Sequence, residues 1–152
     1  MKIFVPQKIT NAIQETIRKT QPKEIKGAFY AKQNNDESFS IDGLFVSEYI
    51  GTNFFCKLLI DKRYRDFEKR YFKERNYEYK KYNYIGDWHS HPEFACIPSL
   101  YDINEANDDL KKSNANFVVQ FIFKLEDGVL IGSAFLFNKK FSSEKINLII
   151  EQ

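Results

Sequence analysis

The chain has 152 residues with a formal net charge of +2, and 43% of them are hydrophobic. This length suits one domain whose core needs no disulfide or structural metal, and the apolar content excludes a disordered chain. The small net charge gives no reason to expect nucleic-acid binding. The sequence has no membrane-length apolar run, and its N-terminal stretch MKIFVPQKITNAIQ has no signal-peptide core, so we expect a cytoplasmic protein without a membrane partner.

The first 60 residues predict several strands and one helix. Isoleucines at positions 9, 13 and 17 recur at helical spacing after Pro6, and the polar stretch QNNDES separates two apolar runs as the turn of a hairpin does. The expected elements are a strand at 2–5, a helix at 6–20, paired strands at 28–32 and 39–49, and a further strand or extended edge at 53–60.

The remaining residues continue the alternation of helices and strands. The expected elements are a helix at 61–81, a strand at 82–91, a helix at 100–112 and a hairpin at 117–137. Asp127 and Gly128 form the dipeptide typical of a tight hairpin turn. The pattern predicts the α/β (α+β) class: a single domain over residues 1–152, with a mixed, mostly antiparallel sheet flanked by helices.

The segment at 61–81 is basic and aromatic. It holds nine Lys or Arg against five Asp or Glu, and Tyr64, Phe67, Tyr71 and Phe72 stand near helical spacing. We favour a solvated helix whose aromatic stripe packs on the sheet. A surface that docks a partner is the alternative interpretation.

Both histidines of the chain, His89 and His91, stand one residue apart in the strand at 82–91. Side chains alternate along a strand, so the two imidazoles point to the same face and can share one metal ion. Pro92 ends the ladder, and the helix at 100–112 brings Asp102 into its first turn. Two histidines and one aspartate are three protein ligands, the number that leaves the fourth position of zinc open in catalytic sites.

Each piece of this pattern also has a simpler interpretation. A His-x-His pair alone is weak, and Ser99 with Asp102 forms a capping box that begins a helix. Cys96 lies between the ligands and is either a competing thiolate ligand or, as we favour, a bystander. His91-Pro-Glu93 imitates the His-x-Glu of zinc nucleobase deaminases, but the Pro-Cys-x-x-Cys of those enzymes is missing, and we reject that class.

The complete pattern, His89-x-His91, seven residues, Ser99, two residues and Asp102, resembles the signature of the JAMM metalloproteases of the JAB/MPN domain family. The family also carries a glutamate near the start of its first sheet strand, often three residues before a glycine, and PKEIKG offers Glu24 at that spacing. The resemblance implies a JAB/MPN domain of cytidine-deaminase-like architecture. The likeness does not extend to the segment 51–81.

The resemblance also implies roles for five residues. His89, His91 and Asp102 would hold Zn²⁺, which brings the pKa of its water to roughly 7. Glu24 would be the general base, and Ser99 would stabilise the oxyanion of the tetrahedral intermediate. Two other carboxylates, Glu37 and Glu48, lack the family spacing and are weaker candidates for the base.

The implied function is a zinc isopeptidase or peptidase that cleaves the amide after the C-terminal glycine of ubiquitin or a ubiquitin-like modifier. The stretch YIGDWHSHPE looks most like bacterial members of the family, some of which accompany E1-like and E2-like proteins in anti-phage operons. Two alternatives remain open. One is a zinc amidase with another substrate, such as a sulfur-carrier precursor, and the other is a non-catalytic MPN interaction domain.

Overall fold

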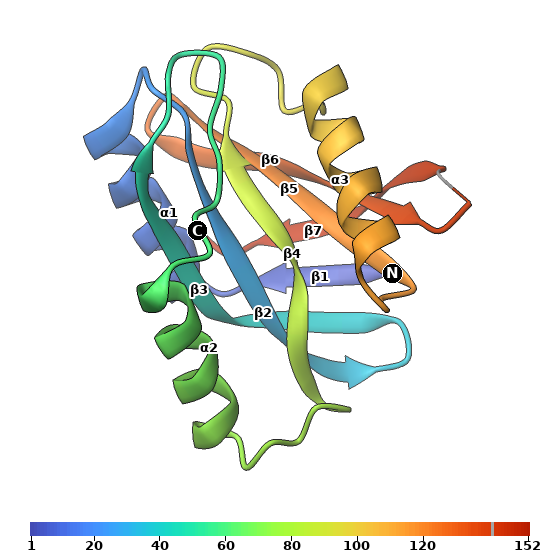
Figure 1. Ribbon diagram of the computed structural model, residues 1–152. Coiled ribbons are helices and arrows are strands. Elements are labelled where there is room, and N and C mark those ends of the chain that lie inside the picture. Colours follow the sequence, from blue (N-terminus) through green and yellow to red (C-terminus); the bar gives the residue numbers. More distant parts are fainter. Residues whose placement is uncertain (141) are drawn as a thin grey trace.

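The computed structural model describes residues 1–140 and 142–152 (Figure 1). Strands and helices alternate along most of the chain. Their bounds are β1 (Lys2–Val5), α1 (Gln7–Thr20), β2 (Ile25–Asn35), β3 (Ser38–Ile50), α2 (Lys62–Glu74), β4 (Tyr82–Ser90), α3 (Leu100–Lys112), β5 (Phe117–Glu126), β6 (Val129–Asn138) and β7 (Ser143–Ile150).

The strands form one sheet that closes on itself in the order β1-β3-β2-β4-β5-β6-β7, with β7 paired to β1. β2 is antiparallel to β3 and β4, and β6 is antiparallel to β5 and β7. β1 runs parallel to both of its neighbours, and β4 runs parallel to β5. The predicted fold class, a mixed sheet flanked by helices, is confirmed.

The main hydrophobic core lies on the inner face of this curved sheet. Every strand contributes to it, and α1 adds Ile13 and Ile17, which are fully buried at the spacing that predicted the helix. Phe29 and Phe121 meet edge to face with ring centroids 4.9 Å apart. Trp88 is also fully buried, and its indole N–H donates to a backbone carbonyl 3.1 Å away, which satisfies its polar atom.

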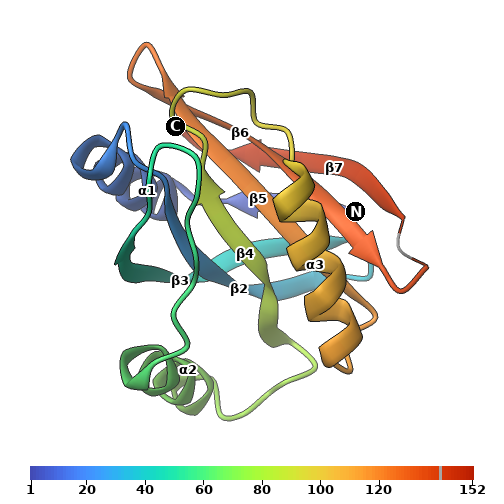
Figure 2. The same cartoon turned by 45° about the horizontal axis from the view of Figure 1, so that its top comes forward.

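Helices α2 and α3 lie on the outer face of the sheet (Figures 1 and 2). α2 begins at the cap Asp61, whose side chain accepts the backbone N–H of Tyr64. Tyr64 and Tyr71 pack from α2 against a second cluster that contains Tyr30 and Phe45 of β2 and β3. The aromatic stripe therefore packs on the sheet, as the favoured interpretation of the basic segment predicted.

Three elements differ from the sequence-based expectations. The strand or extended edge expected at 53–60 does not pair with the sheet, and residues 51–61 instead form an irregular segment that rises near the start of β2 and the end of β4 and then descends to α2 (Figure 1). α2 ends at Glu74 rather than at position 81, because Asn76 and Tyr77 adopt positive φ angles that no right-handed helix accommodates. β7 follows the expected hairpin and was not predicted.

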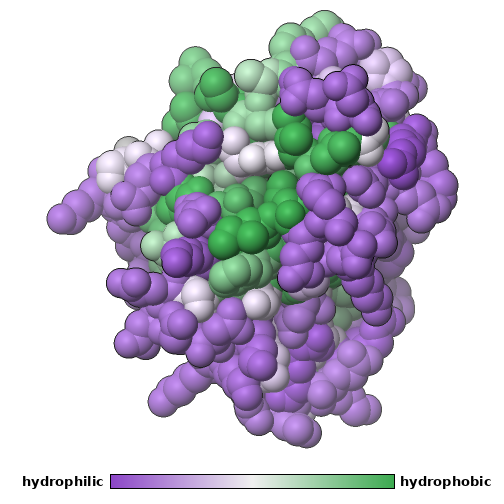
Figure 3. Space-filling view, turned by 180° about the vertical axis from the view of Figure 1, so that it is seen from behind, coloured by the Kyte–Doolittle hydropathy of each residue, from purple (hydrophilic) through white to green (hydrophobic). Residues whose placement is uncertain are grey.

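Charged residues make up 29% of the chain. Figure 3 shows the face opposite to that of Figure 1, where hydrophobic residues gather in the middle and toward the upper edge and hydrophilic ones cover most of the rest. Among the described residues, none of the helices has the length and apolar character needed to cross a membrane.

Replacing Phe121 tests the inner core. Phe121→Ala removes a fully buried ring that contacts Phe29, so we expect the free energy of unfolding to fall by about 3–5 kcal/mol. Val129→Ala, at a position 46% exposed, is the control and should change it by under about 0.5 kcal/mol. Urea denaturation followed by the fluorescence of the single tryptophan, Trp88, measures both. Equal losses in the two variants would contradict the assignment of this core.

Candidate metal centre

The end of β4 directs two histidines to the outer face of the sheet. Trp88 points inward to the core, so His89 and His91 point outward by the alternation of the strand. The pairing continues to the end of the strand, because the His91 N–H donates to the Phe123 carbonyl at 2.9 Å. His89 and His91 are 1% and 6% exposed, so both imidazoles lie in a site largely shielded from water.

The N-terminus of α3 supplies the aspartate. Ser99 caps the helix: its Oγ accepts the Asp102 N–H at 3.1 Å, and its own N–H donates to Asp102 Oδ2 at 2.7 Å. The capping box predicted as the simpler interpretation is therefore present. It also fixes the rotamer of Asp102, whose carboxylate faces the end of β4.

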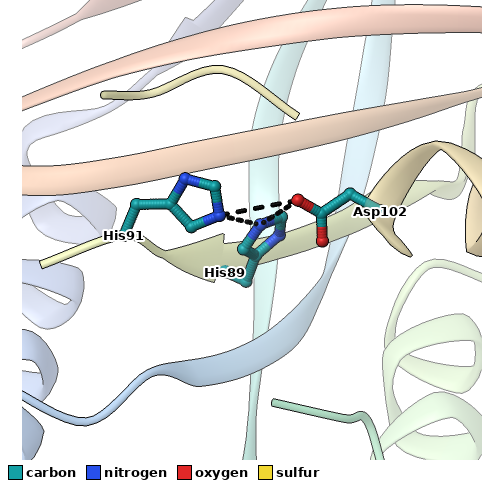
Figure 4. Close-up of side chains that lie close together, drawn as sticks. All are labelled: His89, His91 and Asp102. Carbon is teal, nitrogen blue, oxygen red and sulfur yellow. Dashed lines mark hydrogen bonds and ion pairs between the residues drawn. The ribbon is translucent and has the colours of Figure 1, made fainter. Parts of the chain in front are cut away.

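The three side chains converge on one point (Figure 4). His89 Nε2 and His91 Nε2 lie 3.0 Å apart, and Asp102 Oδ2 lies 3.4 Å from the first and 3.5 Å from the second. Ligand atoms bound to tetrahedral zinc at about 2.0–2.1 Å stand roughly 3.4 Å from one another. The donor set, two imidazole nitrogens and one carboxylate oxygen, therefore fits Zn²⁺ in both chemistry and spacing.

Hydrogen bonds and burial prepare these groups for a cation. His91 Nδ1 lies 3.0 Å from the Ala95 carbonyl, to which it donates, so the lone pair of Nε2 faces the cluster. Burial lowers the pKa of His89, which favours the neutral imidazole that metals bind. Burial opposes ionisation of Asp102, but the two histidines beside it and the hydrogen bond from the Ser99 N–H hold the pKa of this carboxyl well below its usual range.

Glu24 lies beside this cluster at the start of β2. Its backbone is fixed on both sides, because its N–H donates to the Thr52 carbonyl at 2.7 Å and its carbonyl accepts the Gly51 N–H at 2.8 Å. Glu24 is 5% exposed, and burial raises the pKa of its carboxyl. The charge of Asp102 adds to that rise, while His91 and the Cys56 thiol oppose it.

One pocket of about 410 Å³ contains the groups that the sequence predicted as catalytic. Glu24, Ser99, His91 and Asp102 all line it. Its remaining walls are mostly apolar and come from the segment 51–61, the loop after β4 and the start of α3: Phe54, Phe55, Cys56, Phe94, Ala95, Ile97 and Tyr101. The arrangement places a candidate base and a hydroxyl beside three candidate metal ligands in a cleft with apolar walls.

Sequence reasoning missed part of this pocket. Cys56 and the two phenylalanines before it were assigned to a strand, since an apolar run such as NFFCKLLI has high strand propensity. Cys96 lies outside both the pocket and the metal cluster of the described residues. Glu37 and Glu48, the weaker candidates for the base, are exposed and do not line the pocket.

Fold and site together define a mixed α/β domain with a candidate His-His-Asp metal centre at the C-terminal end of β4. The family model for prokaryotic homologs of the JAB domain matches residues 6–132. The chain belongs to this family.

A solved structure supports the fold independently. The solution structure of a protein from Desulfitobacterium hafniense is similar to this chain, with a TM-score of 0.68 and 16% sequence identity over 99% of this chain and 93% of that one. At this identity the likeness concerns the fold alone. No curated protein matches the sequence significantly.

Metal content tests the ligand assignment. Because three ligands converge in a buried site, purified protein should retain about one zinc ion per chain by elemental analysis. The double variant His89→Ala/His91→Ala should retain none, since one carboxylate remains. Cys96→Ser is the control and should keep its zinc. A folded double variant with unchanged zinc content would refute the assignment.

Proposed function

We propose that this protein is a zinc-dependent peptidase that cleaves the amide bond after the C-terminus of a ubiquitin-like modifier, either on a conjugate or on a precursor. The observation that carries the proposal is the presence of Glu24 in the same pocket as His91 and Asp102, whose ligand atoms converge with that of His89. Hydrolysis of an amide at neutral pH needs an electrophilic centre and a group that moves protons, and this pocket brings candidates for both together.

His89, His91 and Asp102 would hold the zinc ion. When bound, zinc supplies Lewis acidity and lowers the pKa of water to roughly 7. Glu24 would accept the proton of the attacking water and deliver it to the departing amine. Its raised pKa, caused by burial, suits this exchange, because a proton carrier works best with a pKa near the working pH.

Ser99 would stabilise the negative charge that develops on the carbonyl oxygen. Its Oγ accepts a hydrogen bond from the Asp102 N–H within the capping box, and this bond uses an oxygen lone pair and leaves the hydroxyl hydrogen available. Ser99 lines the pocket beside His91. The same hydroxyl can therefore cap the helix and donate to an oxyanion, and these two uses do not compete.

The apolar walls of the pocket support a polypeptide substrate. Two aromatic pairs join the three segments around it: Phe54 meets Phe94 with ring centroids 5.7 Å apart, and Phe55 meets Tyr101 at 5.1 Å. Phe54 is 75% exposed and Tyr101 49% exposed. Large aromatic side chains left open to solvent beside a cleft are typical of a surface that binds another chain.

The setting that we propose is a bacterial ubiquitin-like conjugation system linked to anti-phage defence, with E1-like and E2-like proteins as partners. Its support is the resemblance of the stretch at residues 84–93 to bacterial members of the family. Processing of a sulfur-carrier precursor would use the same polar groups and remains the alternative with the same chemistry. A non-catalytic interaction domain would have no need of the converging ligands, and the site does not favour it.

The proposal is tested by incubating the zinc-loaded protein with fusions in which a ubiquitin-like modifier or a sulfur carrier precedes a reporter. Mass spectrometry then locates the cut. We expect cleavage after the last residue of the modifier, and loss of that cleavage after zinc removal by a chelator. Cleavage of the sulfur-carrier fusion alone would favour the alternative substrate. If neither fusion is cleaved, the proposal of a peptidase is contradicted for both substrates.

Replacing Glu24 tests its role in proton transfer. Glu24→Gln preserves size and one acceptor but removes the basic carboxylate, so the cleavage rate should fall at least about a hundredfold while zinc content and fold are retained. Glu37→Gln, an exposed position outside the pocket, is the matched control and should leave the rate unchanged. If Glu24→Gln stays within severalfold of wild type, another group moves the proton.

A further inference from the structure

A row of buried polar side chains lies on the outer face of the sheet beneath α3, next to the candidate ligands. Lys26 of β2 pairs directly with His89 of β4, and Asp87, two residues earlier on β4, pairs with Gln120 of β5. Residues that pair directly across strands point to the same face. Lys26 is 2% exposed and Gln120 is 4% exposed, although neither has a role in the proposed chemistry.

Gln120 contacts the ligand-bearing turn of α3 directly. Its Nε2 donates to the backbone carbonyl of Asp102 at 2.7 Å. That carbonyl lies within α3, where it can accept the backbone N–H of the residue four positions later. The helix therefore does not need the contact with Gln120 to form. The other amide atom, Gln120 Oε1, is buried without a hydrogen-bond partner among the residues that the structure describes.

Lys26 contacts the next turn of the same helix. Its ammonium forms an ion pair with Glu105 of α3 and a second one, at 3.5 Å, with Asp87 of β4. Glu105 follows Asp102 by three residues, so the two side chains lie on the same side of α3. The Lys26 ion pairs therefore join the strand that begins beside Glu24, the strand of the histidines and the helix of the aspartate.

The fully buried apolar residues of α3 lie further along the helix. Ala106 and Leu110 form a cluster with Val118 and Phe137 of β5 and β6, which docks the middle and the C-terminal half of α3. Ile103, next to Asp102, is only partly buried against this cluster, and the first turns of α3 also meet the sheet through Gln120 and Lys26. Apolar side chains of the same volume often stabilise a fold as well as buried ion pairs do. Stability alone therefore does not explain the contacts that Gln120 and Lys26 make with α3.

We propose that Gln120 and Lys26 are positioning residues of the metal centre: they hold the first turns of α3 on the sheet at the height that brings Asp102 Oδ2 to both histidines. This inference rests on the metal site of the proposed function. Loss of such a supporting hydrogen bond typically costs 10- to 100-fold in metal affinity. Gln120 Oε1 has no hydrogen-bond partner among the described residues, which lowers stability. The positioning role explains why an amide side chain stands there in spite of that cost.

The first test separates positioning from folding. Gln120→Met keeps the volume, removes the hydrogen bond to Asp102 and removes the unpartnered oxygen. We expect zinc affinity, measured by competition with a chromophoric chelator, to fall about tenfold or more. The free energy of unfolding of the zinc-free protein should stay the same or rise, because no buried amide remains. Zinc affinity within twofold of wild type would overturn the role of Gln120.

The second test addresses the Lys26 ion pair on the side of α3. Glu105→Ala releases the helix and leaves Lys26 paired with Asp87, so the buried ammonium keeps one partner. We expect zinc affinity to fall about tenfold or more and the absorption of the Co²⁺-loaded protein to change, since that spectrum reports ligand geometry. Asp108→Ala, at an exposed carboxylate on the same helix, is the matched control and should change neither.

The outcomes separate this inference from the function on which it rests. If the wild type binds zinc tightly and Glu105→Ala behaves as Asp108→Ala does, the role of Lys26 is wrong and the metal centre stands. If the wild type does not bind zinc, the metal centre and the positioning role both fall. Peptidase activity enters neither measurement, so failure to find the substrate does not affect the result.

Discussion

β4 and β5 run parallel, so the chain must return along the sheet between them, and α3 makes that return on the outer face. A helix that follows a parallel strand begins near the carboxyl end of that strand. Ser99 and Asp102 therefore arrive beside His89 and His91, although a loop separates them in sequence. The same geometry places binding sites at the carboxyl ends of strands in many open α/β sheets. Without the parallel pair, the histidines would have no third ligand.

The two interpretations of Ser99 and Asp102, a helix cap and a metal ligand, describe one arrangement. Asp102 Oδ2 accepts the Ser99 N–H and also lies within 3.5 Å of both histidines. The cap holds the carboxylate in place before any cation binds, so less side-chain entropy is lost on binding. A capping box at Ser99 and Asp102 is therefore not evidence against a metal site, because the contacts that cap the helix also hold the ligand in position.

Local patterns predicted much of the fold and all of the candidate ligands. Period-2 alternation placed His89 and His91 on one face, and helical spacing placed Ile13 and Ile17 in the core. The segment 51–61 was misread, because its apolar residues wall the pocket instead of pairing with a strand, and propensity does not distinguish these two uses. The roles of Lys26 and Gln120 depend on an element that arrives from far along the chain, and no local pattern reveals such a partner.

The alternation of β4 has an evolutionary consequence. Trp88 belongs to the inner core and its neighbour His89 to the outer face, so successive residues meet different structural requirements. Substitutions at the outward positions leave the inner packing intact, and a descendant could lose its ligands one by one while its scaffold stays folded. The domain of such a descendant could still bind a partner protein. Its relation to the metal-binding ancestor would then be recognised from the residues that face the core.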